Sequence, residues 1–150
     1  MKKTKQIKKI KKPKKKTRWQ LVKMLDAIFS IFIRLRDCYK STRTITCPLC
    51  PRTGDYKHAQ NMHFITRWCL VLRRDETNCH AWCYRCNVLL KGNYIEYTRL
   101  MIDMYCIEYV DQLRSKKNEV SIMKTHEIEE KIQYYKEKVS ELKLLKAIID

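Results

Sequence analysis

Four of the eight cysteines form two Cys-x-x-Cys pairs, Cys47/Cys50 and Cys83/Cys86, separated by 32 residues. Two thiolates at this spacing can bind one cation, and two such pairs complete the tetrahedral set that zinc accepts without a geometric preference of its own. The spacing therefore predicts a structural Zn²⁺ bound by these four residues. The competing interpretations are free thiols or one accidental pair.

The other cysteines have simpler interpretations. Cys79 and the adjacent His80 are alternate metal ligands, but they lie outside the symmetric pattern. We expect Cys38, Cys69 and Cys106 to be small core residues. Zinc sites of this kind occur in binding modules and enzymes alike, so the residues between and after the pairs must indicate the function.

Three polar residues have the types and order of a phosphodiester-cleaving site. His63 lies between the cysteine pairs, Asn78 follows it by fifteen residues, and Asn87 directly follows the last cysteine. A neutral imidazole can take a proton from attacking water because its unperturbed pKa lies near working pH. We expect Asn78 to pin the intervening loop and orient His63, and Asn87 to bind catalytic Mg²⁺ or Mn²⁺, which prefer oxygen ligands. Taken singly, such a histidine is more often a packed residue, and such an asparagine is more often a helix cap.

A large excess of positive charge accompanies these residues. The formal net charge is +17, and residues 1–25 hold eleven lysines, one arginine and no acidic residue. This excess predicts a polyanionic partner, most commonly nucleic acid. The candidate DNA-binding residues are Arg67, Arg73, Arg74, Arg85, Lys91, Lys14, Lys15 and Lys16, although most arginines on a basic protein are simply solvated. The arm at residues 1–18 is expected to order only on phosphate, and its alternatives are a solubilising tail or a nuclear import signal.

Membrane insertion is not expected. The apolar stretch 21–35 contains Lys23, Asp26 and Arg34, so it is too short and too charged to span a bilayer. No apolar run typical of a secretion signal follows the basic N-terminus. The alternative is that the arm and the following amphipathic helix lie on an anionic membrane surface.

Hydrophobic spacing divides the chain after the arm into three parts. Residues 19–40 predict a helix whose apolar residues recur at steps of four and three, namely Leu21, Leu25, Ile28, Phe32, Leu35 and Tyr39. This face packs on a core or, because the steps fit a heptad, forms the seam of a homodimer. Residues 41–93 hold the chemistry and are β-rich at 44–46 and 64–72, with turns expected at Gly54 and Gly92.

Residues 94–150 predict a helical C-terminal region. The first helix, 94–115, is expected to bury one face, formed by Ile95, Ile102, Cys106, Val110 and Leu113. After a polar break, 125–148 is expected to form another helix with the apolar face Ile128, Ile132, Tyr135, Val139 and Leu142.

The segments CPLC, HFITR and LRRDETNCHAWCYRCNVLLKGNYIEY resemble the NinG/Rap family of phage recombination proteins, within a stretch from about residue 27 to residue 142. The order His…Asn…Cys-x-x-Cys-Asn is also similar to HNH nucleases and to the layout of phage endonuclease VII. The resemblance implies an α+β fold in which a small ββα-metal (His-Me finger) zinc core is flanked by long helices. It implies a structure-specific endonuclease for branched DNA, such as Holliday junctions or D-loops, in the cytoplasm of a bacterial host. The layout of the dimeric endonuclease VII adds a homodimer as an expectation, and the alternative location is the nucleus of a eukaryotic host.

The resemblance assigns the four paired cysteines to zinc, His63 to catalysis and Asn87 to the catalytic metal. Relatives usually carry a small residue before this histidine, whereas Met62 stands here, and no acidic residue lies within four positions of His63. Asp55, Asp75 and Glu96 are the candidates for the missing carboxylate. The alternatives to a nuclease are a non-catalytic zinc protein that binds nucleic acid and a regulatory partner that binds protein through its terminal helices.

Overall fold

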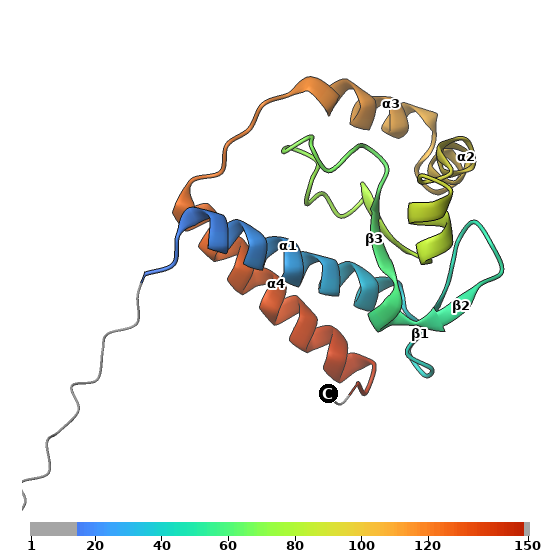
Figure 1. Ribbon diagram of the computed structural model, residues 1–150, viewed down its shortest axis with the longest axis horizontal. Helices are drawn as coiled ribbons and strands as arrows, with labels where there is room; N and C mark the ends of the chain where they lie inside the picture. The colour runs from blue at the N-terminus through green and yellow to red at the C-terminus, as the bar shows by residue number, and fades with distance from the viewer. Residues whose placement is uncertain (1–14, 149–150) are drawn as a thin grey trace, which may run out of the picture.

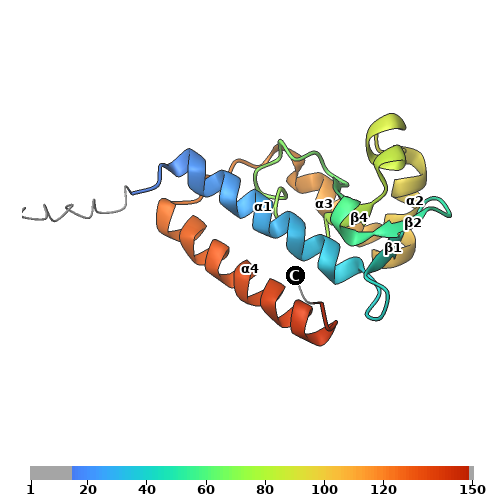
Figure 2. The ribbon, with the colours of Figure 1, turned by 60° about the horizontal axis from the view of Figure 1, so that its bottom comes forward.

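Two long helices, α1 (Arg18–Asp37) and α4 (Thr125–Leu145), lie side by side along one flank of the molecule and run in the same direction (Figures 1 and 2). The computed structural model describes residues 15–148, so Lys14 and most of the basic arm lie outside the described residues. None of the helices in this described part is long and apolar enough to cross a membrane. The remaining elements, two small sheets and two shorter helices, lie on the other side of α1 from α4.

The predicted apolar face of α1 is confirmed. Thr17 begins the helix with a capping box, because its hydroxyl accepts from the Gln20 amide and the Gln20 side chain accepts from the Thr17 amide. The buried residues of α1 share one hydrophobic cluster with the buried face of α4 and with β4, and they are Leu21, Leu25, Phe29, Phe32, Ile33 and Leu35. Because α4 of the same chain covers this face, it is not free to form a dimer seam along its length. Tyr39 lies beyond the helix and is exposed, contrary to expectation.

The predicted face of α4 is confirmed as well, although the helix ends at Leu145. Ile128, Ile132, Tyr135 and Val139 are buried, and Phe29 meets the Tyr135 ring edge-on at 5.0 Å. Just after the helix, the Lys146 ammonium donates to the carbonyl oxygens of Leu35 and Cys38 at the end of α1. A cation there satisfies terminal carbonyls and opposes the negative end of the helix dipole, so it locks the two helix ends together.

The strands form two antiparallel pairs. β1 (Thr44–Thr46), at the predicted position, pairs with β2 (Thr53–Asp55), and β3 (Gln60–His63) pairs with β4 (Cys79–Trp82), so that His63 lies opposite Cys79. The 3-10 turn η1 (Tyr56–His58) joins the two pairs. Gly54 lies within β2 and not in a turn, so that expectation was wrong.

The strand expected at residues 64–72 was also wrong, because this segment is a loop of turns. Phe64, Ile65 and Leu72 are buried as loop side chains. Aromatic and β-branched residues indicate burial as much as they indicate strand pairing, so the composition of this segment predicted a strand where the chain forms a buried loop.

β4 lies between two hydrophobic clusters. Cys79 and Ala81 face the cluster built by α1 and α4, whereas Trp82 belongs to the second cluster, around α2 and the cysteine pairs. The end of α1 holds this strand: Arg36 donates to the Cys79 carbonyl at 2.8 Å, and the Asp37 carboxylate accepts from the Ala81 amide at 2.7 Å. The long helix therefore positions the strand that ends at the second cysteine pair.

The helix predicted at 94–115 is broken in two. A single turn of π-helix, η2 (Arg85–Leu89), precedes α2 (Tyr94–Tyr105), and α3 (Ile107–Ser115) follows before the short 3-10 turn η3 (Lys116–Asn118). The break is at Cys106, whose φ of 65° lies outside the helical region. Cys106, at this turn, is exposed rather than buried. Ile95, in the first turn of α2, is exposed as well, and the buried residues of the two helices are Tyr97, Met101, Val110 and Leu113.

Candidate metal centre and the adjoining cleft

The sulfur atoms of Cys47, Cys50, Cys83 and Cys86 lie within 4.8 Å of one another. A tetrahedral site with zinc–sulfur bonds of about 2.3 Å requires sulfur–sulfur separations of about 3.8 Å, and the Cys50 and Cys83 sulfurs are 3.6 Å apart. Burial raises the pKa of the Cys47 and Cys86 thiols, so a cation is needed to hold them as thiolates. The four cysteines can therefore hold a structural metal ion such as zinc.

The alternate ligands do not join this cluster. The buried His80 ring contacts the Tyr97 hydroxyl through Nδ1 at 2.9 Å and the Tyr105 hydroxyl through Nε2 at 3.2 Å. Burial lowers the pKa of His80 to about 4, which keeps it neutral. Cys79 is fully buried, as are the expected core residues Cys38 and Cys69.

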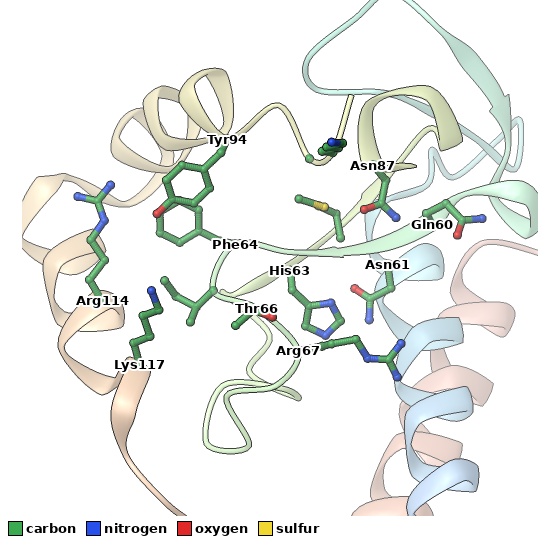
Figure 3. A pocket seen from close by; sticks show the side chains of 14 residues that line it. Gln60, Asn61, His63, Phe64, Thr66, Arg67, Asn87, Tyr94, Arg114 and Lys117 are labelled. Atoms are coloured by element: carbon green, nitrogen blue, oxygen red, sulfur yellow. The ribbon is translucent and has the colours of Figure 1, made fainter. Parts of the chain in front are cut away.

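A cleft of about 820 Å³ lies beside the metal centre, between β3 and the α2–α3 arm (Figure 3). His63, Asn61, Asn87 and Arg67 line one end of it, and Figure 3 shows their side chains gathered there. Lys91, Arg114 and Lys117 also line it, and no acidic residue does among the described residues. The cleft therefore has the charge of a phosphate-binding surface.

His63, at the end of β3, has the geometry of a base. Its Nε2 lies 3.0 Å from the Arg73 carbonyl oxygen, which can only accept a hydrogen bond. Burial, together with the charges of Arg67 and Arg73, lowers the pKa of His63. The ring is thus neutral near pH 7 with its proton on Nε2, which leaves Nδ1 as a free acceptor.

Asn78 pins the loop between β3 and β4 as the sequence indicates. It is fully buried, its side-chain oxygen accepts from the Ile65 amide at 2.7 Å, and its nitrogen donates to the carbonyls of Ile65 and Leu72 at 3.0 and 2.9 Å. The Phe64 amide donates to the Asn78 carbonyl at 2.8 Å. These bonds fix both ends of the loop that presents the Arg73 carbonyl to His63.

Asn87 reaches the same cleft because η2 starts directly at the second cysteine pair, where the Asn87 amide donates to the Cys83 carbonyl at 3.1 Å. Asn61 is a cleft residue that the sequence interpretation missed. It is two residues before His63, so both side chains are on one face of β3, and its buried Oδ1 has no partner among the described residues. The sequence contained one signal for Asn61: side chains alternate along a strand, so the residue two positions before His63 lies on the same face of the strand.

Arg73 and Arg74 do not point freely to solvent. The Asp26 carboxylate of α1 lies 2.5 Å from Arg73 Nη2 and 2.6 Å from Arg74 Nη2, and the Arg74 side chain is 7% exposed. The structure thus gives both arginines an internal partner in place of the expected phosphate. Asp26 lines a smaller hollow with Asn61 and His63, and it is the one acidic residue among the described residues that line this hollow or the cleft. Asp55, Asp75 and Glu96 line neither of them.

The other predicted DNA-binding residues are dispersed. Arg67 and Lys91 line the cleft, whereas Arg85 is exposed on η2. Lys15 and Lys16 are exposed at the start of the described chain, beside α4. Arg114 and Lys117 are cleft residues that the sequence interpretation did not identify, because only the turn at Cys106 brings α3 back to the cleft.

Comparison with known families identifies a family to which the chain is similar. A model of the bacteriophage lambda NinG protein family matches residues 1–145, which is nearly the whole chain. A search of the curated proteins and a search of the solved structures each found no match.

Proposed function

The chain belongs to the family of the bacteriophage lambda NinG protein, and from that premise we propose that it is a metal-dependent endonuclease acting on branched DNA recombination intermediates. The proposal places a ββα-metal core of the HNH type in β3, β4 and η2. The observation that carries it is His63: its Nε2 is committed to the Arg73 carbonyl, and its Nδ1 is left as an acceptor in a cationic cleft.

In the proposed reaction, His63 Nδ1 takes a proton from the water whose oxygen attacks the scissile phosphorus. The bond from phosphorus to the 3′ oxygen breaks, and the leaving 3′ oxygen takes a proton from solvent. Because the neutral ring is maintained by burial, the base is available at pH 7. The Asn78 bonds hold the loop whose carbonyl orients the ring, so Asn78 is a positioning residue. Arg67 and Lys91 would hold the neighbouring phosphates at this end of the cleft.

A divalent cation, Mg²⁺ or Mn²⁺, would supply stabilisation of the charge that develops on the phosphate. The side-chain oxygens of Asn87 and Asn61 line the cleft and suit such a hard ion. Among the described residues, Asp26 alone supplies a carboxylate to the adjoining hollow, and its oxygens are shared with Arg73 and Arg74.

One observation favours a second candidate, a non-catalytic zinc protein that binds nucleic acid. No carboxylate of the described residues lines the cleft, and a protein that binds phosphates without cleaving them needs only the cationic residues. Both candidates place DNA in the same cleft.

Cleavage of a labelled four-way junction and of a matching linear duplex distinguishes the two candidates. The assay contains Zn²⁺ and either Mg²⁺ or Mn²⁺, and it compares the wild type with His63→Ala and with His126→Ala, whose ring is exposed on α4. We expect metal-dependent cutting of the junction by the wild type and by His126→Ala, and no cutting by His63→Ala. Tight junction binding without cutting by any of the three proteins would contradict the nuclease and support the second candidate.

A further inference from the structure

An aromatic pair forms the wall of the cleft next to the candidate base. Phe64 directly follows His63, and its ring stacks on the Tyr94 ring with centroids 5.5 Å apart and planes 6° from parallel. Phe64 is buried, but Tyr94 remains 49% exposed. Figure 3 shows the Tyr94 ring overlying that of Phe64 within the cleft, on the side away from Asn87. An aromatic ring that is backed by another ring and open to the cleft is the arrangement on which nucleobases stack.

Tyr94 is held in this place by the metal centre. Lys91, Gly92 and Asn93 all have positive φ values, 49°, 85° and 39°, which produce a tight turn before α2 begins at Tyr94. The Gly92 amide donates to the carbonyl of the metal ligand Cys86 at 3.0 Å, so the turn is fixed to the second cysteine pair. The φ of 85° favours glycine at residue 92, because L side chains rarely adopt it, and a Cβ there would also displace the end of the Met62 side chain. The ring is therefore preorganised and does not depend on a mobile loop.

Cations surround the far side of the aromatic pair. The Arg114 guanidinium lies 5.8 Å from the Phe64 ring centroid, and Lys117 lines the same end of the cleft. Arg114 also contacts Asp111 at 3.4 Å, an exposed pair that leaves most of its donors available. No described acidic residue lines the cleft at this end. A phosphate at Arg114 and Lys117 and a base on Tyr94 would complete one nucleotide.

We propose that this end of the cleft, formed by Tyr94 on Phe64 with Arg114 and Lys117, is a binding subsite for an unpaired nucleotide next to the scissile phosphate. Because a base inside a duplex is covered on both faces by its neighbours, an unpaired base places a free face on Tyr94 more readily than a base within a duplex does. This inference rests on the proposed DNA function and deepens it. It implies that branches with unpaired nucleotides, such as forks and flaps, bind better than fully paired junctions or duplexes.

The test uses a forked DNA with 2-aminopurine at the first unpaired position, and a duplex with 2-aminopurine at the corresponding paired position. Binding is measured with Zn²⁺ but without added Mg²⁺ or Mn²⁺, for the wild type, Tyr94→Leu, Tyr94→Trp and the control Tyr39→Leu, whose ring is exposed beyond α1. Stacking quenches 2-aminopurine, so we expect its fluorescence to fall on binding the wild type, Tyr94→Trp and Tyr39→Leu. With Tyr94→Leu we expect no quenching and a fork affinity lower by about 5- to 150-fold, with duplex affinity changed less than about 2-fold.

Three results would overturn the subsite. They are an unchanged ratio of fork to duplex affinity in Tyr94→Leu, equal quenching by all four proteins, and no fork binding by the wild type. The outcome is separable from that of the nuclease proposal, because this assay involves no cleavage. If the wild type cuts the junction in the cleavage assay but the ratio of fork to duplex affinity is unchanged in Tyr94→Leu, the subsite is refuted and the nuclease is retained. If Tyr94 quenches the fork in the binding assay but the wild type does not cut, the nuclease is refuted and the subsite is retained.

Discussion

Replacement of Asn78 by alanine should be among the most destabilising single changes in the chain. The Asn78 amide makes three buried hydrogen bonds, to the Ile65 amide, the Ile65 carbonyl and the Leu72 carbonyl. Each such bond contributes about 0.5–1.5 kcal/mol net, and a buried group left without a partner costs about 1–3 kcal/mol. We therefore expect the free energy of unfolding to fall by about 3–5 kcal/mol, a large part of the about 5–15 kcal/mol that a domain possesses.

Urea unfolding at constant Zn²⁺ measures this loss, and the melting temperature should fall by about 6–20 °C. Asn78→Asp tests the direction of the bonds, because it places a second acceptor against two carbonyl oxygens and should be no more stable than Asn78→Ala. Asn118→Ala, at an exposed position in η3, is the matched control and should change the free energy by less than about 0.5 kcal/mol. A loss below about 1 kcal/mol for Asn78→Ala would refute the inference that this side chain holds the loop.

Three further predictions concern the metal centre, the base and α1. Cys86→Ser should abolish stoichiometric zinc, measured by metal analysis. It should also loosen the start of α2, because the Cys86 carbonyl that accepts from the Gly92 amide would no longer be held in place by a metal-bound side chain. Cys106→Ser, at an exposed thiol, should retain one zinc per chain. Because burial lowers the pKa of His63, the logarithm of the cleavage rate should be level above about pH 6.5 and should fall only below the lowered pKa. Arg67→Gln removes a nearby positive charge, so it should move the inflection of the pH–rate profile to higher pH. An inflection above about pH 7 in the wild type would contradict the assignment of His63 as the base. Asp26→Asn should leave Arg73 and Arg74 without their carboxylate and lower the free energy of unfolding by about 2 kcal/mol. The same change should reduce the cleavage rate by a larger factor than it reduces the affinity for DNA. Equal losses in rate and affinity would argue against a positioning role for Asp26.

Features that depend on local spacing were predicted well from the sequence. The two Cys-x-x-Cys pairs meet in one cluster, and the apolar faces of α1 and α4 are buried where their periodicity places them. Both signals are short-range: a ligand pair spans one turn, and a helical stripe repeats within seven residues. Asn78 makes the loop-pinning bonds expected of it from its place in the order of polar residues, and its role in orienting His63 for catalysis stays a prediction.

Features that depend on the burial of irregular backbone were not predicted. The segment 64–72 has the composition of a strand, but the Asn78 side chain provides backbone partners that a neighbouring strand would otherwise supply. In the same way, the spacing in 94–115 fits one helix, and only the positive φ of Cys106 divides it. A side chain that hydrogen-bonds to the backbone of a loop, like Asn78, produces no periodic pattern in the sequence. A single unusual backbone dihedral, like the φ of Cys106, produces none either.

The carboxylate near His63 shows the limit of motif comparison most clearly. The sequence around His63 contains no acidic residue, so Asp55, Asp75 and Glu96 were the predicted candidates for the missing carboxylate. The structure instead brings Asp26, 37 residues earlier, to the hollow beside His63 through the packing of α1 on β3 and the following loop. There it binds Arg73, whose own carbonyl oxygen is the partner of His63 Nε2. The long helix thus does more than cover the core: through one residue it connects the helical pair to the candidate base, which is why the rate should respond to Asp26 even if Asp26 never binds a metal.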